Sequence, residues 1–240
     1  MRILPVTGLP EIREGDDLAA LVVERVTLED RDVLVVAQKA VSKAEGRIVR
    51  LDDIEPSSRA VELAVDGEDP RRTEVILREA VEIVRIRPPL LIVETRHGFI
   101  CASAGVDASN APEPGTLVLL PLDPDASAAR IRDRVRDLTG AIVGVIVSDS
   151  FGRPWRQGTT DVALGAAGIR VMEDLRGTRD RIGYELKSTQ IAIADQLAGA
   201  AQLVMGKADG IPVAVVSGLD VAGEGTAKEL LIPADRDLFR

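Results

Sequence analysis

The sequence predicts a mixed α/β (α+β) fold, because segments with strand and helix patterns intermingle along the chain without strict alternation. Hydrophobic residues make up 45% of the 240 positions but aromatic residues only 2%, so the core must consist of Val, Ile, Leu and Ala. No internal repeat, low-complexity tract or obvious linker interrupts the chain. We therefore expect residues 1–240 to form a single domain, large enough to contain two lobes.

The N-terminal part predicts a strand at residues 1–6 and then a loop at 7–12, whose Gly and Pro residues fix its path. Asp16 or Asp17 is suited to cap a helix that runs through Val26. The apolar run at 32–37 predicts a buried strand. Four polar side chains follow it closely: Gln38, Lys39, Ser42 and Lys43.

Helical spacing of apolar residues begins at Pro56 and again at Pro70, where it extends through Val84 and stops at Pro88 and Pro89. A hairpin is predicted next, with strands at 90–94 and 99–102. A polar loop leads to a strand at 116–120, and a helix opens at 123–125 and ends at Gly140.

The segment 141–154 is central to the interpretation, because its apolar, β-branched residues 141–147 predict a strand that crosses a buried sheet. Ser148, Asp149 and Ser150 follow at its carboxyl end, where open sheets present ligand-binding groups. Gly152 and Pro154 are expected to turn the chain. Beyond them we expect a strand at 168–173, a charged loop at 175–183, a long helix at 185–205 and a last strand at 213–216.

Composition excludes several classes of function. A net charge of -9 argues against a nucleic-acid partner, and the single Cys101 excludes an internal disulfide framework or a cysteine zinc cluster. The single His97 lies between two apolar runs and is interpreted as an ordinary turn residue. No run reaches membrane-spanning length and no signal peptide is present, so a cytoplasmic protein without membrane contact is expected.

Residues that favour a phosphate or metal site are distributed over several loops. Gly206-Lys207 lacks the earlier glycine of a P-loop, and Gly223-Glu224-Gly225 lacks the third glycine of a dinucleotide fingerprint. An assembled site remains, in which Asp107, Asp149 and Ser150 supply oxygen ligands for Mg²⁺ or Mn²⁺. Lys39, Lys43, Lys207 and the backbone N–H groups of 206–210 would hold phosphates.

Each of these residues has a purely structural alternative. Asp107 fits an Asx turn that caps its own loop, and Asp149 fits a strand-end cap. Lys43 fits a solvated surface charge, and residues 206–210 fit a helix C-cap and turn. Spacing alone does not decide between the two interpretations.

Five motifs occur in order along the chain: Gly8-Leu9-Pro10, Ser42-Lys43-Ala44-Glu45-Gly46-Arg47, Ala104-Gly105-Val106-Asp107-Ala108-Ser109-Asn110, Ser148-Asp149-Ser150-Phe151-Gly152-Arg153 and Met205-Gly206-Lys207-Ala208-Asp209-Gly210-Ile211-Pro212. Together they resemble the coenzyme F420-0:L-glutamate ligase (gamma-glutamyl ligase) family, over residues 3 to 226. The resemblance implies a GTP-dependent enzyme that uses Mg²⁺ or Mn²⁺ with K⁺ and adds L-glutamate to the phospholactyl end of the deazaflavin coenzyme F420-0. It also implies a two-lobed fold in an intertwined homodimer.

Carried over by position, the resemblance assigns metal ligands to Asp107, Asp149 and Ser150 and a phosphate clamp to Lys43. Arg153 is a candidate for binding the acidic substrate. The chain departs from the family at Gln38-Lys39, where some members have small hydroxyl residues, and at Lys207, where some archaeal members have an acidic one. It also ends before the nitroreductase-like domain of some bacterial relatives. GTP contacts are implied for Leu9, Pro10, Glu11, Ile12, Gln38, Lys39, Lys43, Asn110, Met205, Gly206, Lys207, Ala208, Asp209, Gly210, Ile211 and Pro212.

Two other function classes remain open at this point. The same two aspartates fit a metal-dependent phosphohydrolase that releases phosphate from a nucleotide without an acceptor. A catalytically inert nucleotide-binding or dimer-forming module is the third hypothesis.

Overall fold

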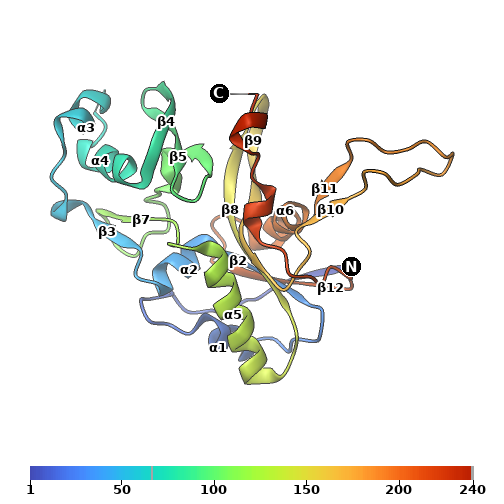
Figure 1. The fold of residues 1–240 in the computed structure, drawn as a ribbon. Helices are drawn as coiled ribbons and strands as arrows, with labels where there is room; N and C mark the ends of the chain where they lie inside the picture. The colour runs from blue at the N-terminus through green and yellow to red at the C-terminus, as the bar shows by residue number, and fades with distance from the viewer. Residues whose placement is uncertain (66, 239–240) are drawn as a thin grey trace.

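The computed structural model describes residues 1–65 and 67–238, which form a mixed α/β fold around a five-stranded sheet (Figure 1). The strand order is β1 (Arg2–Pro5), β12 (Val213–Ser217), β2 (Val33–Ala37), β8 (Gly144–Arg153) and β9 (Arg156–Ala167). Only β2 and β8 pair in parallel; the other neighbours are antiparallel. The predicted mixed fold class is therefore confirmed.

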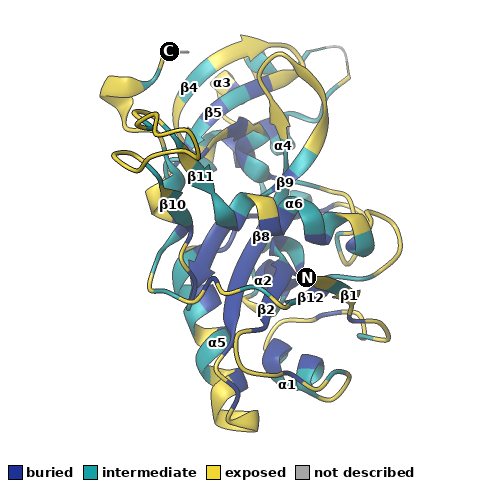
Figure 2. Ribbon diagram, turned by 90° about the vertical axis from the view of Figure 1, so that its right-hand side faces the viewer, coloured by how far each residue is buried: buried dark blue, intermediate teal, exposed yellow. Residues whose placement is uncertain are grey.

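Helices cover both faces of this sheet, which explains why its central strand β2 is apolar at every position. On β2, Leu34 and Val36 pack toward α1 (Leu18–Val23) and α5 (Pro124–Thr139), whereas Val33 and Val35 pack toward α6 (Ile193–Met205). Figure 2 shows the sheet as a mainly buried layer between these helices. Asp17 and Asp123 cap the N-termini of α1 and α5, because each side chain accepts a backbone N–H three residues on.

A second group of elements has its own apolar cluster beside this sheet. It contains α3 (Ser58–Leu63), α4 (Pro70–Glu79) and the antiparallel sheet β4 (Ala80–Arg87), β5 (Leu90–Thr95) and β6 (Ile100–Ala102). Val75 and Ile76 of α4 pack against Leu91 and Val93 of β5. The short pair β3 (Ile48–Arg50) and β7 (Thr116–Val118) lies where the chain passes between the two groups.

An arm extends from the body at the strand pair β10 (Met172–Asp174) and β11 (Gln190–Ala192), and Figure 1 shows its connecting loop reaching away from the sheet. Most of its residues are exposed, including Ile182 and Tyr184. Among the described residues, no helix combines the length and apolar character needed to cross a membrane.

Several predicted element boundaries are wrong, and the strand predicted at 168–173 spans only Met172–Asp174. The helix from Pro70 ends at Glu79, and the residues up to Val84 belong to β4, because they pair with β5. The strand predicted at 141–147 starts at Gly144 and continues to Arg153, because its polar residues pair with β9, which was not predicted. The last helix starts at Ile193 rather than at residue 185, and α1 ends at Val23 rather than at Val26.

Candidate functional site

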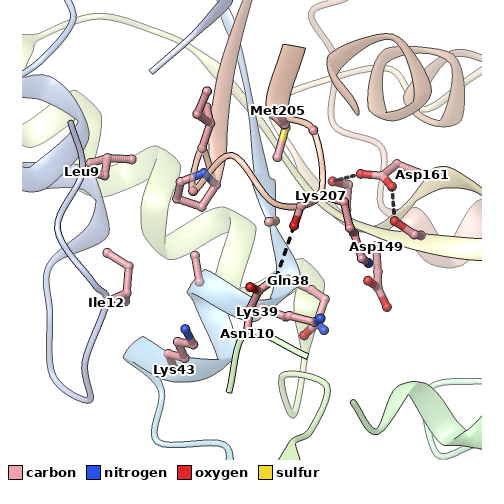
Figure 3. Close-up of a pocket in the computed structure, with 18 of the residues that line it drawn as sticks. Leu9, Ile12, Gln38, Lys39, Lys43, Asn110, Asp149, Asp161, Met205 and Lys207 are labelled. Atoms are coloured by element: carbon pink, nitrogen blue, oxygen red, sulfur yellow. Dashed lines mark hydrogen bonds between the residues drawn. The ribbon is translucent and has the colours of Figure 1, made fainter. Parts of the chain in front are cut away.

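A cavity of about 310 Å³, here called the central cavity, opens at the carboxyl end of β2, beside the middle of β8 (Figure 3). Ala37 pairs with Ser148 in the parallel ladder, so the residues that follow Ala37 and Ser148 lie at one edge of the sheet. The predicted residues that line it are Leu9, Pro10, Glu11, Ile12, Gln38, Lys39, Lys43, Asn110, Asp149, Ser150, Met205, Gly206, Lys207, Gly210, Ile211 and Pro212. Ala37, Ala40, Ser148 and Asp161 complete its wall.

Helix α2 (Gln38–Ala44) begins directly after β2 and turns two lysines toward this cavity, because Lys39 and Lys43 are four residues apart. The Lys43 side chain is largely buried and its ammonium forms an ion pair with the exposed carboxylate of Glu11. Burial excludes the alternative in which Lys43 is a solvated surface charge.

Asp107 lies behind Lys39 rather than in the cavity wall. Lys39 Nζ donates to Asp107 Oδ2 at 2.6 Å and to the Ser109 carbonyl at 3.0 Å. Burial alone would raise the pKa of Asp107, but hydrogen bonds from Lys39 and Ser109 outweigh it and hold the pKa at about 2. The Ser109 N–H also donates to Asp107 Oδ1 at 2.8 Å, so the predicted Asx turn is present together with the lysine contact.

Asp149 lies in the middle of β8, so the strand-end-cap interpretation is wrong. Its side chain is partly exposed at the cavity, yet enough protein surrounds it that burial raises its pKa to about 6. The Ser150 N–H and the charges of Lys207 and Lys39 lower this pKa without offsetting the burial. Lys39 therefore contacts Asp107 and acts electrostatically on Asp149, which places both predicted carboxylates around one cation.

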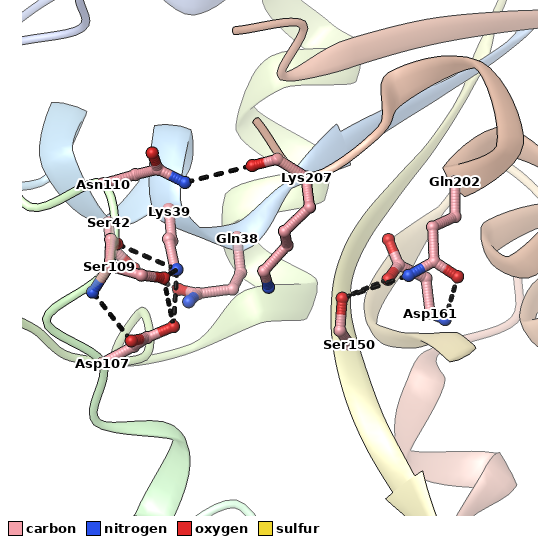
Figure 4. A network of polar contacts seen from close by, with 10 residues as sticks. All are labelled: Gln38, Lys39, Ser42, Asp107, Ser109, Asn110, Ser150, Asp161, Gln202 and Lys207. Carbon is pink, nitrogen blue, oxygen red and sulfur yellow. Dashed lines mark hydrogen bonds and ion pairs between the residues drawn. The ribbon is translucent and has the colours of Figure 1, made fainter. Parts of the chain in front are cut away.

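Ser150 belongs to a polar network that includes Asp161, a site residue that sequence analysis missed (Figure 4). Asp161 on β9 accepts from Ser150 Oγ at 2.6 Å and from Ser148 Oγ at 3.3 Å. Gln202 of α6 donates to Ser150 Oγ at 3.3 Å, and its side-chain oxygen accepts the Asp161 N–H at 3.1 Å. The network fixes the hydroxyl of Ser150 from two neighbouring elements.

The loop after α6 closes the cavity on the side away from α2. Gly206 caps α6 with a φ of 63°, and a Cβ atom there would lie 2.0 Å from Asp209 Oδ2, so this position requires glycine. Asn110 Nδ2 donates to the Lys207 carbonyl at 3.3 Å, which joins this loop to that of Asp107 (Figure 3). The C-cap interpretation of 206–210 is thus confirmed, while the wall of the cavity includes Gly206, Lys207 and Gly210 but not Ala208 or Asp209.

Gln38 carries an unpaired hydrogen-bond donor at this cavity. Its side chain is 1% exposed, and its Oε1 accepts from Ser42 Oγ at 2.9 Å. Its Nε2 has no hydrogen-bond partner among the described residues. A buried donor without a partner is costly, so its position in the cavity wall favours a ligand that presents an acceptor oxygen.

The donors around Asp149 fit a hard divalent cation. They are carboxylate and hydroxyl oxygens, and the raised pKa of Asp149 indicates a buried negative charge without full compensation. In the part of the chain that the structure describes, no three His, Cys, Asp or Glu side chains form a metal-binding cluster. A cation there would need further oxygen ligands from a phosphate or water.

Three other singled-out residues lie outside the central cavity. His97 occupies the turn between β5 and β6, where its Nε2 lies 2.9 Å from the Pro121 carbonyl and its ring stacks on Phe99, as predicted for a turn residue. Burial lowers its pKa. Arg153 and Cys101 line a second cavity of about 440 Å³, here called the side cavity, which shares Asp149 and Ser150 with the central one.

Comparison with known proteins identifies the family of the chain. Residues 8–218 match the family described as F420-0:Gamma-glutamyl ligase. A protein of Methanopyrus kandleri named coenzyme F420:L-glutamate ligase is 50% identical, with 100% of this chain and 98% of the relative aligned. Proteins of the same name from Archaeoglobus fulgidus and Methanocaldococcus jannaschii are 46% and 44% identical, with 100% and 97% of this chain and 96% and 94% of each relative aligned. The chain belongs to the F420-0:gamma-glutamyl ligase family.

Proposed function

We propose that this protein is a ligase that uses GTP to join L-glutamate to coenzyme F420-0. The carrying observation is the central cavity, which gathers three lysines, an unpaired amide donor and Asp149 at one edge of the sheet. The relatives of this chain that are named coenzyme F420:L-glutamate ligase align over almost their full length, and their name supports L-glutamate and the F420 precursor as the two substrates.

The chemistry requires an activated acyl group, because a carboxylate does not react with an amine in water. An acceptor carboxylate oxygen attacks the γ-phosphorus of GTP, so that an acyl phosphate forms and GDP leaves. The glutamate amine then attacks the acyl carbon, loses a proton and expels phosphate as the amide bond forms. Neither step needs a His or Cys nucleophile, because positioning and charge neutralisation provide most of the catalysis in phosphoryl transfer.

The cationic side of the cavity would bind the triphosphate. Lys43 exchanges its Glu11 partner for a phosphate oxygen, which is feasible because the Glu11 side chain is 62% exposed and can move into solvent. The amide of Gln38 donates to a second oxygen, and Lys207 approaches from the opposite loop. Charge-assisted contacts of this kind give ~1.5–3 kcal/mol each.

Asp149 and Ser150 would hold Mg²⁺ or Mn²⁺, with K⁺ as a second cation, and Asp107 would join them by exchanging its Lys39 partner for the metal. The divalent ion supplies neutralising charge to the phosphates when it is bound. Asp149 provides a carboxylate already held at the cavity, and Asp161 orients the Ser150 hydroxyl. Lys39 keeps the Asp107 carboxylate ionised, since its hydrogen bond contributes to the low pKa of that group.

We infer that the protein acts as an intertwined, two-lobed homodimer. The exposed apolar side chains of the arm, Ile182 (84% exposed) and Tyr184 (62% exposed), support an interface with a second copy. The separate apolar cluster around α4 and β5 supports the two lobes. Light scattering of Ile182→Glu should then give half the native mass; an unchanged mass would contradict this interface.

Mass spectrometry of the protein incubated with GTP, Mn²⁺, L-glutamate and F420-0 tests the function directly. A product heavier by glutamyl units is expected, and Asp149→Ala should abolish it. Phosphate released from GTP without F420-0 and without a heavier product would instead identify the phosphohydrolase. No turnover under either condition would favour the inert module.

A further inference from the structure

The side cavity adjoins the central cavity across β8. It is lined by Leu90, Ile92, Ile100, Cys101, Ala102, Gly105 and the β8 segment from Asp149 to Pro154. Asp149 and Ser150 belong to both walls. A ligand in the side cavity therefore meets a ligand of the central cavity at these two residues.

The two cavities differ in chemical character. Gln38 and the lysines Lys39, Lys43 and Lys207 line the central cavity, and none of them lines the side cavity. The side cavity has aliphatic walls from β5 and β6, and Arg153 is its single cationic lining residue. Polyphosphate thus fits the central cavity, whereas an apolar ring system with one anionic group fits the side cavity.

The position of Asp149 on β8 lets its carboxylate line both the central and the side cavity. Side chains alternate along a strand, so Asp149 and Phe151 share one face of β8 while Ser150 points to the other. Phe151 packs edge-on against Phe99, with ring centroids 6.3 Å apart, which fixes this face of β8 near the β5–β6 turn. Leu90 and Ile100 remain 42% and 37% exposed, which leaves apolar surface available to a flat ligand.

We propose that the side cavity binds the acceptor substrate of the ligase, with its flat deazaflavin ring against Leu90, Ile92 and Ile100, its phosphodiester at Arg153 and its carboxylate next to Asp149. This inference rests on the proposed function. L-Glutamate alone does not explain the cavity, because a small amino acid with three charged groups has little apolar surface to place against aliphatic walls. The assignment puts the acceptor carboxylate where the γ-phosphate of a nucleotide in the central cavity meets Asp149.

Two variants with matched controls test the assignment by equilibrium dialysis of F420-0 and by steady-state kinetics. Ala102→Phe adds bulk at an exposed lining position, and Val81→Phe introduces the same side chain at an exposed position of β4 outside the cavity. Arg153→Gln removes the positive charge that lines the cavity. Its control is Arg156→Gln, which removes the positive charge of the residue opposite Arg153 in the β8–β9 hairpin. We expect both cavity variants to weaken F420-0 binding by ~10–100-fold, as for a lost contact to a charged group, with the KM for GTP unchanged and both controls near wild type.

The outcomes separate this inference from the proposed function. Wild-type protein that forms no glutamylated product refutes the ligase itself. Wild-type turnover together with unchanged F420-0 affinity in Arg153→Gln and Ala102→Phe refutes only the side-cavity assignment. A raised KM for GTP in both cavity variants would also overturn it, because the cavity would then hold the nucleotide.

Discussion

Replacing Asp149 by Asn should make the cation-free protein more stable at neutral pH. Burial raises the pKa of the Asp149 carboxyl from 3.8 to about 6, so the folded state disfavours the ionised form. Between those two values the folded state binds more protons than the unfolded state, and stability from this group falls as the pH rises. Above about pH 6 the folded protein carries the full free-energy cost of the buried, ionised Asp149 carboxylate, and below pH 3.8 this cost is absent.

The size of the effect follows from the same pKa difference. Each pKa unit corresponds to ~1.4 kcal/mol, so the ionised carboxylate costs at most ~3 kcal/mol at neutral pH. Water reaches part of the side chain at the cavity, which reduces this cost to about 1–3 kcal/mol. Asn carries no charge and should recover that amount, at the expense of the carboxylate proposed to bind the metal.

Urea unfolding of chelator-treated wild type and Asp149→Asn at several pH values measures the difference. The two unfolding free energies should agree near pH 4, diverge as the pH rises to about 6, and differ by a constant amount above that. Added Mn²⁺ should stabilise the wild type and leave the variant unchanged, because the cation is proposed to bind this carboxylate. Equal stabilities at neutral pH, or a difference independent of pH, would refute the argument from burial.

Three further results are expected. Gln38→Met removes the unpaired Nε2 donor together with the acceptor of the Ser42 hydroxyl, so stability should fall and calorimetry on the folded variant should show GTP binding weakened by ~10–100-fold; equal GTP affinity would exclude the phosphate contact. Gly165→Ala should lower the melting temperature, by ~2–4 °C per kcal/mol of strain, because its Cβ atom would lie 2.1 Å from the Pro124 carbonyl. Gly152→Ala, with no atom within 4 Å, is its control. Asp161→Asn should weaken Mn²⁺ binding by ~10–100-fold through the orientation of Ser150, with an unchanged titration contradicting that role.

Much of the central cavity was predictable from sequence, because its residues follow buried strands. The apolar runs at 32–37 and 141–147 define two neighbouring strands, and their carboxyl ends carry Lys39 and Asp149 to one edge. The motif at 205–212 lies where an apolar helix ends, so its glycines mark the loop on the opposite wall. These features depend on local pattern, which sequence records directly.

The features that were missed depend on pairing between distant segments. The residues of β4 have apolar spacing that also fits a helix, and only pairing with β5 decides for a strand. β9 is rich in Gly, Ala and Thr, so its strand state depends on β8 beside it and on α5 and α6 against it. Asp161 gives no signal of its own, because its role arises from its register opposite Ser150.

The wall of the central cavity is drawn from stretches that are far apart in the chain, around residues 9–12, 37–43, 110, 148–161 and 205–212. Partial folding therefore leaves no fragment able to hold a ligand there, and occupancy is coupled to the integrity of the whole molecule. A bound compound should raise the unfolding free energy by RT ln(1 + [L]/Kd). A thermal-shift screen of nucleotides would rank purine and phosphate-chain preferences before any catalytic assay has been set up.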